Sequence, residues 1–272
     1  MKRIISLALA GVLSLALFSS CGQKAPTLEE LNSAVKKTEA LEGTDTDVTM
    51  NMKMSISGMT IDSDFSGNVK VAKEDGKLVK FLSNITATMG TESSTTSMYY
   101  ADGYTYTDYA GMKTKTETSE IEALSSAAVE IPDFDLNDET VTDFSSEAVD
   151  GEYKCTVSLN TDKIKDKLGE LLGEYTNSEA DSSDNLNFSS ASGYYIIDKN
   201  GYCSEYNFKF DMKMSDESLG EYSAAIDMTA KYNNIGEKVE ITAPADLDEY
   251  SENPYGDLGD LGDMGDLGDF DE

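Results

Sequence analysis

The chain has 272 residues, of which 52 are acidic and 21 basic, giving a formal net charge of −31. Such an acidic chain offers no basic patch to a polyanion, so nucleic acid is excluded as a partner. The absence of His excludes a Ser-His-Asp triad, a Cys-His pair and a histidine metal site.

The first twenty residues have the three parts of a secretory signal peptide. Lys2 and Arg3 supply positive charge, residues 4–18 are uncharged, and two small residues, Ser19 and Ser20, end the run. The uncharged run is shorter than the roughly 20 residues that a membrane-spanning helix needs. We therefore expect residues 1–20 to be a cleaved signal peptide rather than a transmembrane anchor.

The end of this segment, Phe18-Ser19-Ser20-Cys21, resembles the bacterial lipobox, although Phe18 stands where an aliphatic residue is usual. The resemblance implies that the Cys21 thiol carries a diacylglyceryl group and that Cys21 is the first residue of the mature chain. Residues 21–26 would then be a lipidated tether, of which residues 22–26 span at most about 18 Å. The lipid, rather than a basic patch, would hold the acidic chain on the extracytoplasmic face of a bacterial membrane.

A capped helix is predicted directly after the tether. Thr27 and Glu30 have the spacing of a capping box, and apolar residues follow at near-helical spacing until Gly43. We expect a helix over 28–42.

Apolar and polar residues then alternate with period two, which predicts strands with one apolar face. Asp-Gly and Ala-Gly pairs mark the turns. The expected strands are 48–56, 59–71, 79–89, 95–100, 104–109, 112–117, 140–149, 152–160, 193–198, 201–214, 221–233 and 238–242.

Two further helices and a loop are expected between these strands. Residues 119–130 have the composition of a short helix, and Thr161 caps a second one with an apolar side that ends near Tyr175. Residues 176–192 are rich in Ser, Asn and Asp and predict a loop.

The chain ends in Gly-Asp-Leu repeats that begin at Gly256. Glycine entropy and like charge oppose folding there, and the absence of Pro from the repeats argues against a collagen helix. We expect one domain over 27–245 and a disordered acidic tail over 246–272.

Cys155 and Cys203 would form a disulfide if they met in an oxidising compartment. Strict alternation places Cys155 on the apolar face of its strand and Cys203 on the polar face, which argues against a bridge. Cys203 lies next to a turn, where alternation can slip, so the bridge stays open as an alternative.

No motif in the sequence predicts catalysis or a cofactor. There is no phosphate loop, nucleophile elbow or calcium loop, and Asp62 and Asp64 read as part of a solvated strand face rather than a calcium site or an acid-base pair. We expect no enzyme activity, with a carboxylate-only glycosidase as the alternative.

The apolar faces are unusually rich in Met and aromatic residues. Met side chains are flexible and adapt to irregular apolar partners. The expected sheet has more apolar surface than three short helices cover, which favours a hydrophobic ligand. The alternative is an ordinary filled core in a structural or interaction lipoprotein. The candidate ligand-binding residues are Met50, Met52, Met54, Phe65, Phe81, Ile85, Phe208, Phe210, Met212 and Met228.

Several features together resemble the LolA/LppX/LprG-like lipid-carrier lipoprotein superfamily. They are the lipobox, the capped first helix, the Met-rich strands, the segment 98–106 and the segment 239–244. The resemblance covers roughly 28–245. It implies an α+β fold in which a curved antiparallel sheet forms an incomplete β-barrel with helices packed across its concave face. In such carriers the concavity holds acyl chains, and the fold brings no catalytic residue. No protein partner is indicated.

The lipobox gives a direct prediction. Metabolic labelling with a palmitate analogue should mark the wild-type chain, and Cys21→Ala should lose the label because the acceptor thiol is gone. A labelled Cys21→Ala chain would contradict the assignment.

Overall fold

The protein is described here by a computed structural model, which covers residues 24–56, 58–120, 123, 134–165, 186–216 and 220–252. Its elements are α2 (Leu28–Glu39), β1 (Gly43–Ile56), β2 (Met59–Glu74), β3 (Lys77–Met89), β4 (Glu92–Ala101), β5 (Tyr104–Tyr109), β6 (Met112–Glu117), β7 (Val141–Val149), β8 (Glu152–Leu159), β9 (Leu186–Ile197), β10 (Cys203–Asp216), β11 (Gly220–Asn233) and the 3₁₀ helix η2 (Leu247–Glu249).

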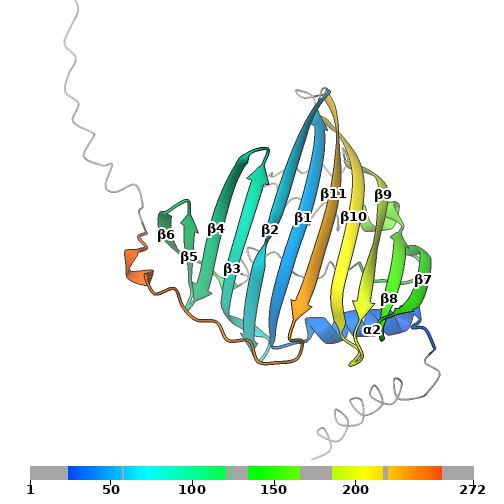
Figure 1. Cartoon of the computed structure of the whole chain (residues 1–272), viewed down its shortest axis with the longest axis horizontal. Helices are drawn as coiled ribbons and strands as arrows, with labels where there is room; N and C mark the ends of the chain where they lie inside the picture. The colour runs from blue at the N-terminus through cyan, green and yellow to red at the C-terminus, as the bar shows by residue number, and fades with distance from the viewer. Residues whose placement is uncertain are drawn as a thin grey trace, which may run out of the picture.

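All eleven strands form one curved antiparallel sheet that does not close into a barrel (Figure 1). The order is β6-β5-β4-β3-β2-β1-β11-β10-β9-β8-β7. Every neighbouring pair is consecutive in the chain except β1 and β11. The sheet is therefore two meanders, β1–β6 and β7–β11, which are joined along β1 and β11. The expected antiparallel sheet is confirmed.

The hairpin turns lie at the Asp-Gly and Ala-Gly pairs that the sequence marks as turns. Four two-residue hairpin turns have a positive φ at both residues, which favours Gly at the second position. These are Asp75-Gly76, Asp102-Gly103, Ala110-Gly111 and Asp150-Gly151.

The helices are described in part. Helix α2 begins with the expected capping box, in which Thr27 and Glu30 each accept a hydrogen bond from the backbone N–H of the other. Residues 161–165 are helical, as expected. The rest of that helix and most of the expected helix 119–130 lie outside the described residues, as do Cys21 and the Gly-Asp-Leu repeats.

Two strand assignments from the sequence were wrong. β9 begins at Leu186, within the expected loop, and its pairing with β10 contains a bulge at Asp211 and Met212 that interrupts the alternation. Residues 238–242 form no strand. Instead, this segment runs past the ends of the strands, where Val239 lies against Gly43.

The outer face of the sheet, opposite α2, is polar. The Asn68 amide donates to Asp45 and Asp47, at 2.8 Å each, across β2 and β1. On β10 and β11, the Asn207 amide donates to Asp227 at 2.6 Å, and Lys209 forms an ion pair with Asp227 at 2.7 Å. Burial alone would raise the pKa of Asp227, but the bonds from Lys209 and Asn207 lower it overall. This face remains suited to water.

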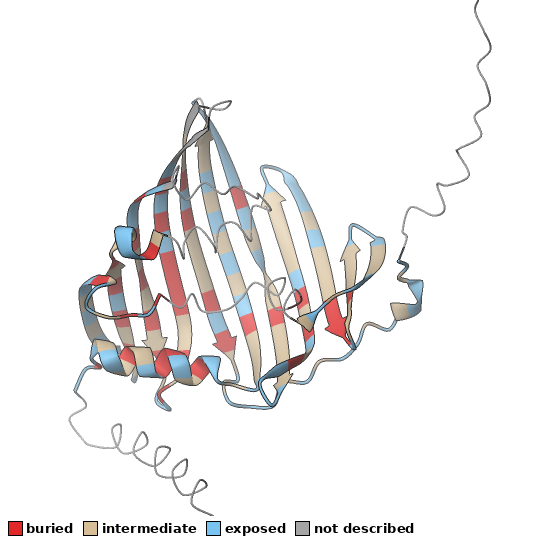
Figure 2. Cartoon of the chain, turned by 180° about the vertical axis from the view of Figure 1, so that it is seen from behind, coloured by how far each residue is buried: buried red, intermediate tan, exposed pale blue. Residues whose placement is uncertain are grey.

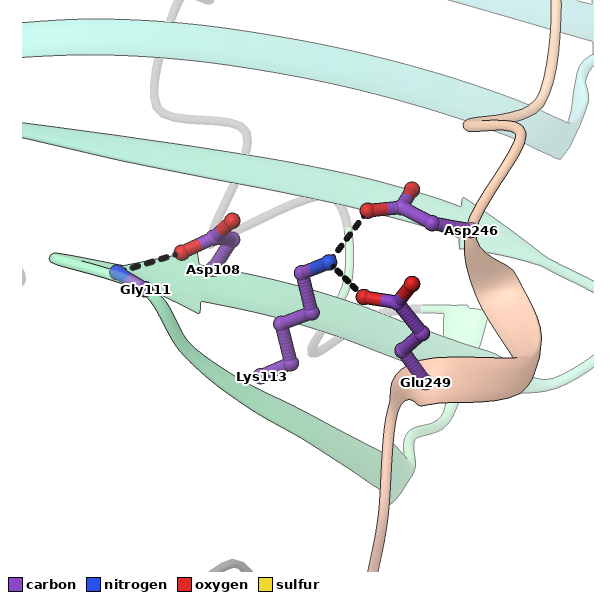
Figure 3. A network of polar contacts seen from close by, with 5 residues as sticks. All are labelled: Asp108, Gly111, Lys113, Asp246 and Glu249. Atoms are coloured by element: carbon purple, nitrogen blue, oxygen red, sulfur yellow. Dashed lines mark hydrogen bonds and ion pairs between the residues drawn. The ribbon is translucent and has the colours of Figure 1, made fainter.

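The C-terminal segment covers the free edge of β6. Lys113 on β6 binds the carboxylates of both Asp246 and Glu249 (Figure 3), and these contacts raise its pKa. Ser251 pairs with the β6 backbone around Thr114. Residues 246–252 are thus packed on the sheet, and the folded unit extends beyond the boundary at 245 set from the sequence.

The two described cysteines are free and buried. Cys203 lies in the main core on the α2 side, not on the polar face, because a bulge between Cys203 and Glu205 shifts the alternation. Cys155 is on β8, and β9 separates β8 from β10. Two strand spacings are about 9.6 Å, beyond the roughly 7 Å between Cα atoms that a disulfide can bridge. Strand order, rather than opposite faces, keeps the thiols apart.

Both thiols should be unreactive until the protein unfolds. Burial, with Glu30 nearby, raises the pKa of Cys155 to about 12, and burial also raises that of Cys203. Because the thiolate is the reactive form, a chain with Cys21→Ser should react with a thiol reagent at neutral pH only as urea unfolds it. Fast reaction of the native chain would contradict this burial, and a need for reductant in urea would reveal a disulfide.

Candidate ligand-binding face

The strand register brings all ten candidate residues onto one face of the sheet, the face against which α2 packs, here called the α2 face. Met50 on β1 lies opposite Phe65 on β2 and Met228 on β11. Met228 in turn lies opposite Phe208 on β10. The candidates occupy five adjacent strands, β3, β2, β1, β11 and β10.

Part of this face is already filled. Phe208, Phe210 and Met212 have at most 3% of their surface exposed and belong to the main core. The Phe134 ring meets Phe208 edge-on, with 5.1 Å between ring centroids, and Leu31 of α2 joins the same core. These three candidates are packed by the protein itself.

A second, smaller core lies toward the other edge. Phe81 is fully buried and stacks on Tyr100, with 6.0 Å between ring centroids. Val69 and Leu78 complete the cluster together with Ala123. Phe81 is therefore a packed candidate as well.

The remaining six candidates lie between the two cores and are half-buried. They are Met50, Met52, Met54, Phe65, Ile85 and Met228. Met50, Met52 and Met228 contact the main core, and Ile85 contacts the smaller one. We call these six residues the open row. Sequence alternation placed them on the apolar face but could not separate them from the packed candidates.

Two glycines bring neighbouring strands close together, Gly193 on β9 beside Phe208 and Gly67 on β2 beside Ile85. At Gly193 a Cβ atom would lie 2.8 Å from the Phe208 ring and 2.1 Å from the Asn207 carbonyl oxygen. At Gly67, which lies opposite Ile85 on β3, a Cβ atom would lie 2.8 Å from Ile85 and 2.0 Å from the Asn84 carbonyl oxygen. A larger residue at either position would force the neighbouring backbone to move.

Helix α2 lies across the lower ends of the strands on one side of the face, where it contacts β9 and β10 (Figure 2). Its position is fixed at the turn between β9 and β10. The Thr38 hydroxyl accepts a hydrogen bond from the Cys203 backbone N–H at 2.8 Å and donates to Ala34 at 3.1 Å. Lys37 donates to the Asn200 carbonyl at 2.6 Å. These contacts hold α2 over β9 and β10, away from the middle of the open row.

The open row carries no charge of its own. On β1, β2 and β11, the described residues on the α2 face from the open row outward are all uncharged: Met50, Met52, Met54, Ile56, Met59, Ile61, Ser63, Phe65, Tyr222, Ala224, Ile226 and Met228. This surface can contact a hydrocarbon but has no ionised group with which to bind an ionic headgroup or to perform acid-base chemistry.

The acidic residues considered from the sequence lie elsewhere. Asp62 forms an ion pair with Lys53 at 3.9 Å, with both side chains mostly exposed, and Asp64 accepts a hydrogen bond from the Asn51 amide. Within the described ranges, no group of three or more Cys, Asp or Glu residues is placed to hold a metal ion. Nor is any described helix both long and apolar enough to cross a bilayer.

A family model described as "Family of unknown function (DUF6612)" matches residues 27–251. The chain belongs to this family. The match begins at the N-cap of α2 and ends at Ser251, the residue that pairs with β6. A search of curated proteins finds no match to this DUF6612 member.

Several solved structures are similar to this DUF6612 chain. LprF from Mycobacterium bovis is 14% identical, with a TM-score of 0.40 over 81% of this chain and 99% of its own. Lipoprotein LppX from Mycobacterium tuberculosis is 14% identical, with a TM-score of 0.36 over 79% and 97%. A LolA superfamily protein from Nitrosomonas europaea is 8% identical, with a TM-score of 0.23 over 80% and 99%. LppX and a LolA superfamily protein are therefore among the similar structures, and both names occur in the resemblance stated from the sequence.

The hydrogen bond between α2 and β10 gives a stability prediction. Thr38→Val keeps the shape of the side chain but leaves the buried Cys203 N–H without that acceptor, which should lower the free energy of unfolding by about 1–3 kcal/mol. The exposed Thr49→Val on β1 is the control and should stay within about 0.5 kcal/mol. Urea denaturation measures both, and equal effects would show that this bond does not hold the helix.

Proposed function

We propose that this chain is a membrane-anchored extracytoplasmic lipoprotein that binds or carries a hydrophobic, lipid-like ligand on the α2 face. The observation that carries the proposal is the open row. Six apolar side chains lie half-buried side by side between two filled cores, at the centre of a sheet whose other face is polar.

A bound hydrocarbon would be stabilised by the apolar area that it buries. Each apolar side chain that moves from partial exposure to full burial gains about 25 cal/mol for each Å² removed from water. A flexible hydrocarbon chain that lies along Met50, Met52 and Met54 would bury its own surface as well as theirs. Met suits this role because its unbranched side chain adjusts to ligands of different shape.

The packed candidates have a supporting role in this proposal. Phe208, Phe210, Met212 and Phe81 would form the rigid margins of the binding surface and contact a ligand only through neighbouring side chains. The ligand would lie on the open row, and the lipid on Cys21 would keep the protein at the membrane. No enzyme activity is part of this proposal.

A second function is favoured by the packing of the main core. The aromatic side chains of β9 and β10, covered by α2, are filled in the manner of an ordinary domain core. If the open row is merely the loose margin of that core, the protein is a structural or interaction lipoprotein that binds no ligand. The two functions differ in whether lipid binds to the open row.

Native mass spectrometry tests the proposal. A chain with Cys21→Ser should retain co-purified lipid or bind added monoacylglycerol, and Met50→Gln/Met52→Gln should weaken binding by about tenfold, the factor that corresponds to about 1.4 kcal/mol of lost apolar contact.

The control is Thr49→Gln/Lys53→Gln, which alters the same strand on the outer face and should bind as the wild type does. A Cys21→Ser chain, otherwise unchanged, that carries no lipid and ignores added lipid would favour the second function. Equal losses in both variants would show that binding does not use the open row.

A further inference from the structure

The end of the sheet opposite α2 carries exposed apolar side chains. Met59, Ile61 and Met89 are exposed by 67%, 41% and 56%. They lie where β2 begins and β3 ends, at the end of β1 that points away from α2 (Figure 1). Together with Met54 and Ile56 they are called here the apolar tip.

The apolar tip continues the open row along the same face. Met59 lies opposite Ile56, Ile61 lies opposite Met54, and both pairs follow the pair formed by Phe65 and Met50 along the same two strands. On β3, Met89 faces Ser63, which is between Ile61 and Phe65. Apolar side chains therefore run without a charged residue from water to the middle of the sheet, over about 20 Å of strand.

The charges around the tip restrict what can use it. Glu92 on β4 lies directly opposite Met89, while Lys53 and Asp62 pair with each other on the outer face. A bilayer-docking surface depends on basic or aromatic interfacial residues to meet lipid headgroups. The five tip residues include neither kind, and the aromatic side chain beside them on this face belongs to Tyr222 of β11, opposite Ile56. Glu92 and the net charge of −31 also disfavour an anionic headgroup.

The tip is also far from the start of the described chain. Pro26 accepts a hydrogen bond from Ser146 of β7 near the α2 end of the sheet. The fourteen residues of β1 separate that end from the tip, a distance of about 45 Å. A membrane anchor upstream of Pro26 would therefore hold the opposite end of the sheet.

On the basis of the proposed function, we propose that the apolar tip is the mouth through which one hydrocarbon chain of a lipid without net charge enters the open row. The methyl end of the hydrocarbon lies toward Met50 and Met228, and the lipid headgroup stays in water beside Met59 and Met89. Exchange of the lipid would then take place at the end of the protein that faces away from its anchor.

Photo-crosslinking tests the direction of entry. The probes are two monoacylglycerols, one with a diazirine next to the ester and one with a diazirine at the end of the acyl chain. With the Cys21→Ser chain, the ester-side probe should label Met59, Ile61 or Met89, and the chain-end probe should label Met50, Met52 or Met228. Reversed labelling, or identical labelling by both probes, would overturn the proposed entry route.

A kinetic comparison separates the mouth from the binding surface. Met59→Gln/Ile61→Gln/Met89→Gln should slow both association and release of a fluorescent monoacylglycerol by about tenfold, because the apolar path into the row is interrupted. Met112→Gln, at an exposed Met of β6, is the matched control and should change neither rate. The variant positions are exposed, so thermal unfolding should be unaffected.

The outcomes distinguish the two proposals. If the Cys21→Ser chain binds neither probe, the proposed function fails together with the mouth. If the probes label the open row but the triple variant keeps wild-type rates, the mouth alone is wrong. If the Cys21→Ser chain floats with phosphatidylcholine vesicles and the triple variant does not, the tip docks on a bilayer and the proposed mouth is overturned.

Discussion

The pairing of β1 with β11 is the interaction on which the rest of the structure depends. Every other strand pair joins consecutive strands, whereas this pair joins segments that are far apart in the chain and makes one sheet of two meanders. Because strand faces alternate with period two, a slip of one residue would move Met50, Met52 and Met54 to the outer face. The same register keeps the aspartates and asparagines of β1 and β2 in water and the methionines together.

This constraint also explains why the sheet has more apolar face than α2 covers. Joining the meanders places β1, with Met50, Met52 and Met54, and β11, with Met228, at the centre, while Thr38 and Lys37 fix α2 over β9 and β10. One core is filled beneath the helix and another around Phe81. The open row lies between the two cores, on β1, β11 and the neighbouring strands β2 and β3.

Period-two alternation was sufficient to predict most strands, the hairpin turns and the common face of all ten candidate residues. It failed where the backbone departs from that period. The bulge beside Cys203 moved its side chain into the core, and the bulge at Asp211 hid the start of β9. Residues 238–242 alternate like a strand, but β1 already has a partner on each side, so this segment passes the strand ends toward β6. Burial within the shared face depends on where α2 lies, which involves contacts between residues more than 160 positions apart.

A tryptophan reporter gives the most direct test of whether a hydrocarbon chain lies on the open row. The chain has no Trp, so Met50→Trp places a single fluorophore on the row, and Thr49→Trp places one on the outer face of the same strand. With Cys21→Ser in both chains, a monoacylglycerol brominated on its acyl chain should quench the Trp at position 50 on contact and leave the Trp at position 49 bright. Equal quenching of the two reporters, or none in either, would contradict the assignment of this face as a lipid-binding surface.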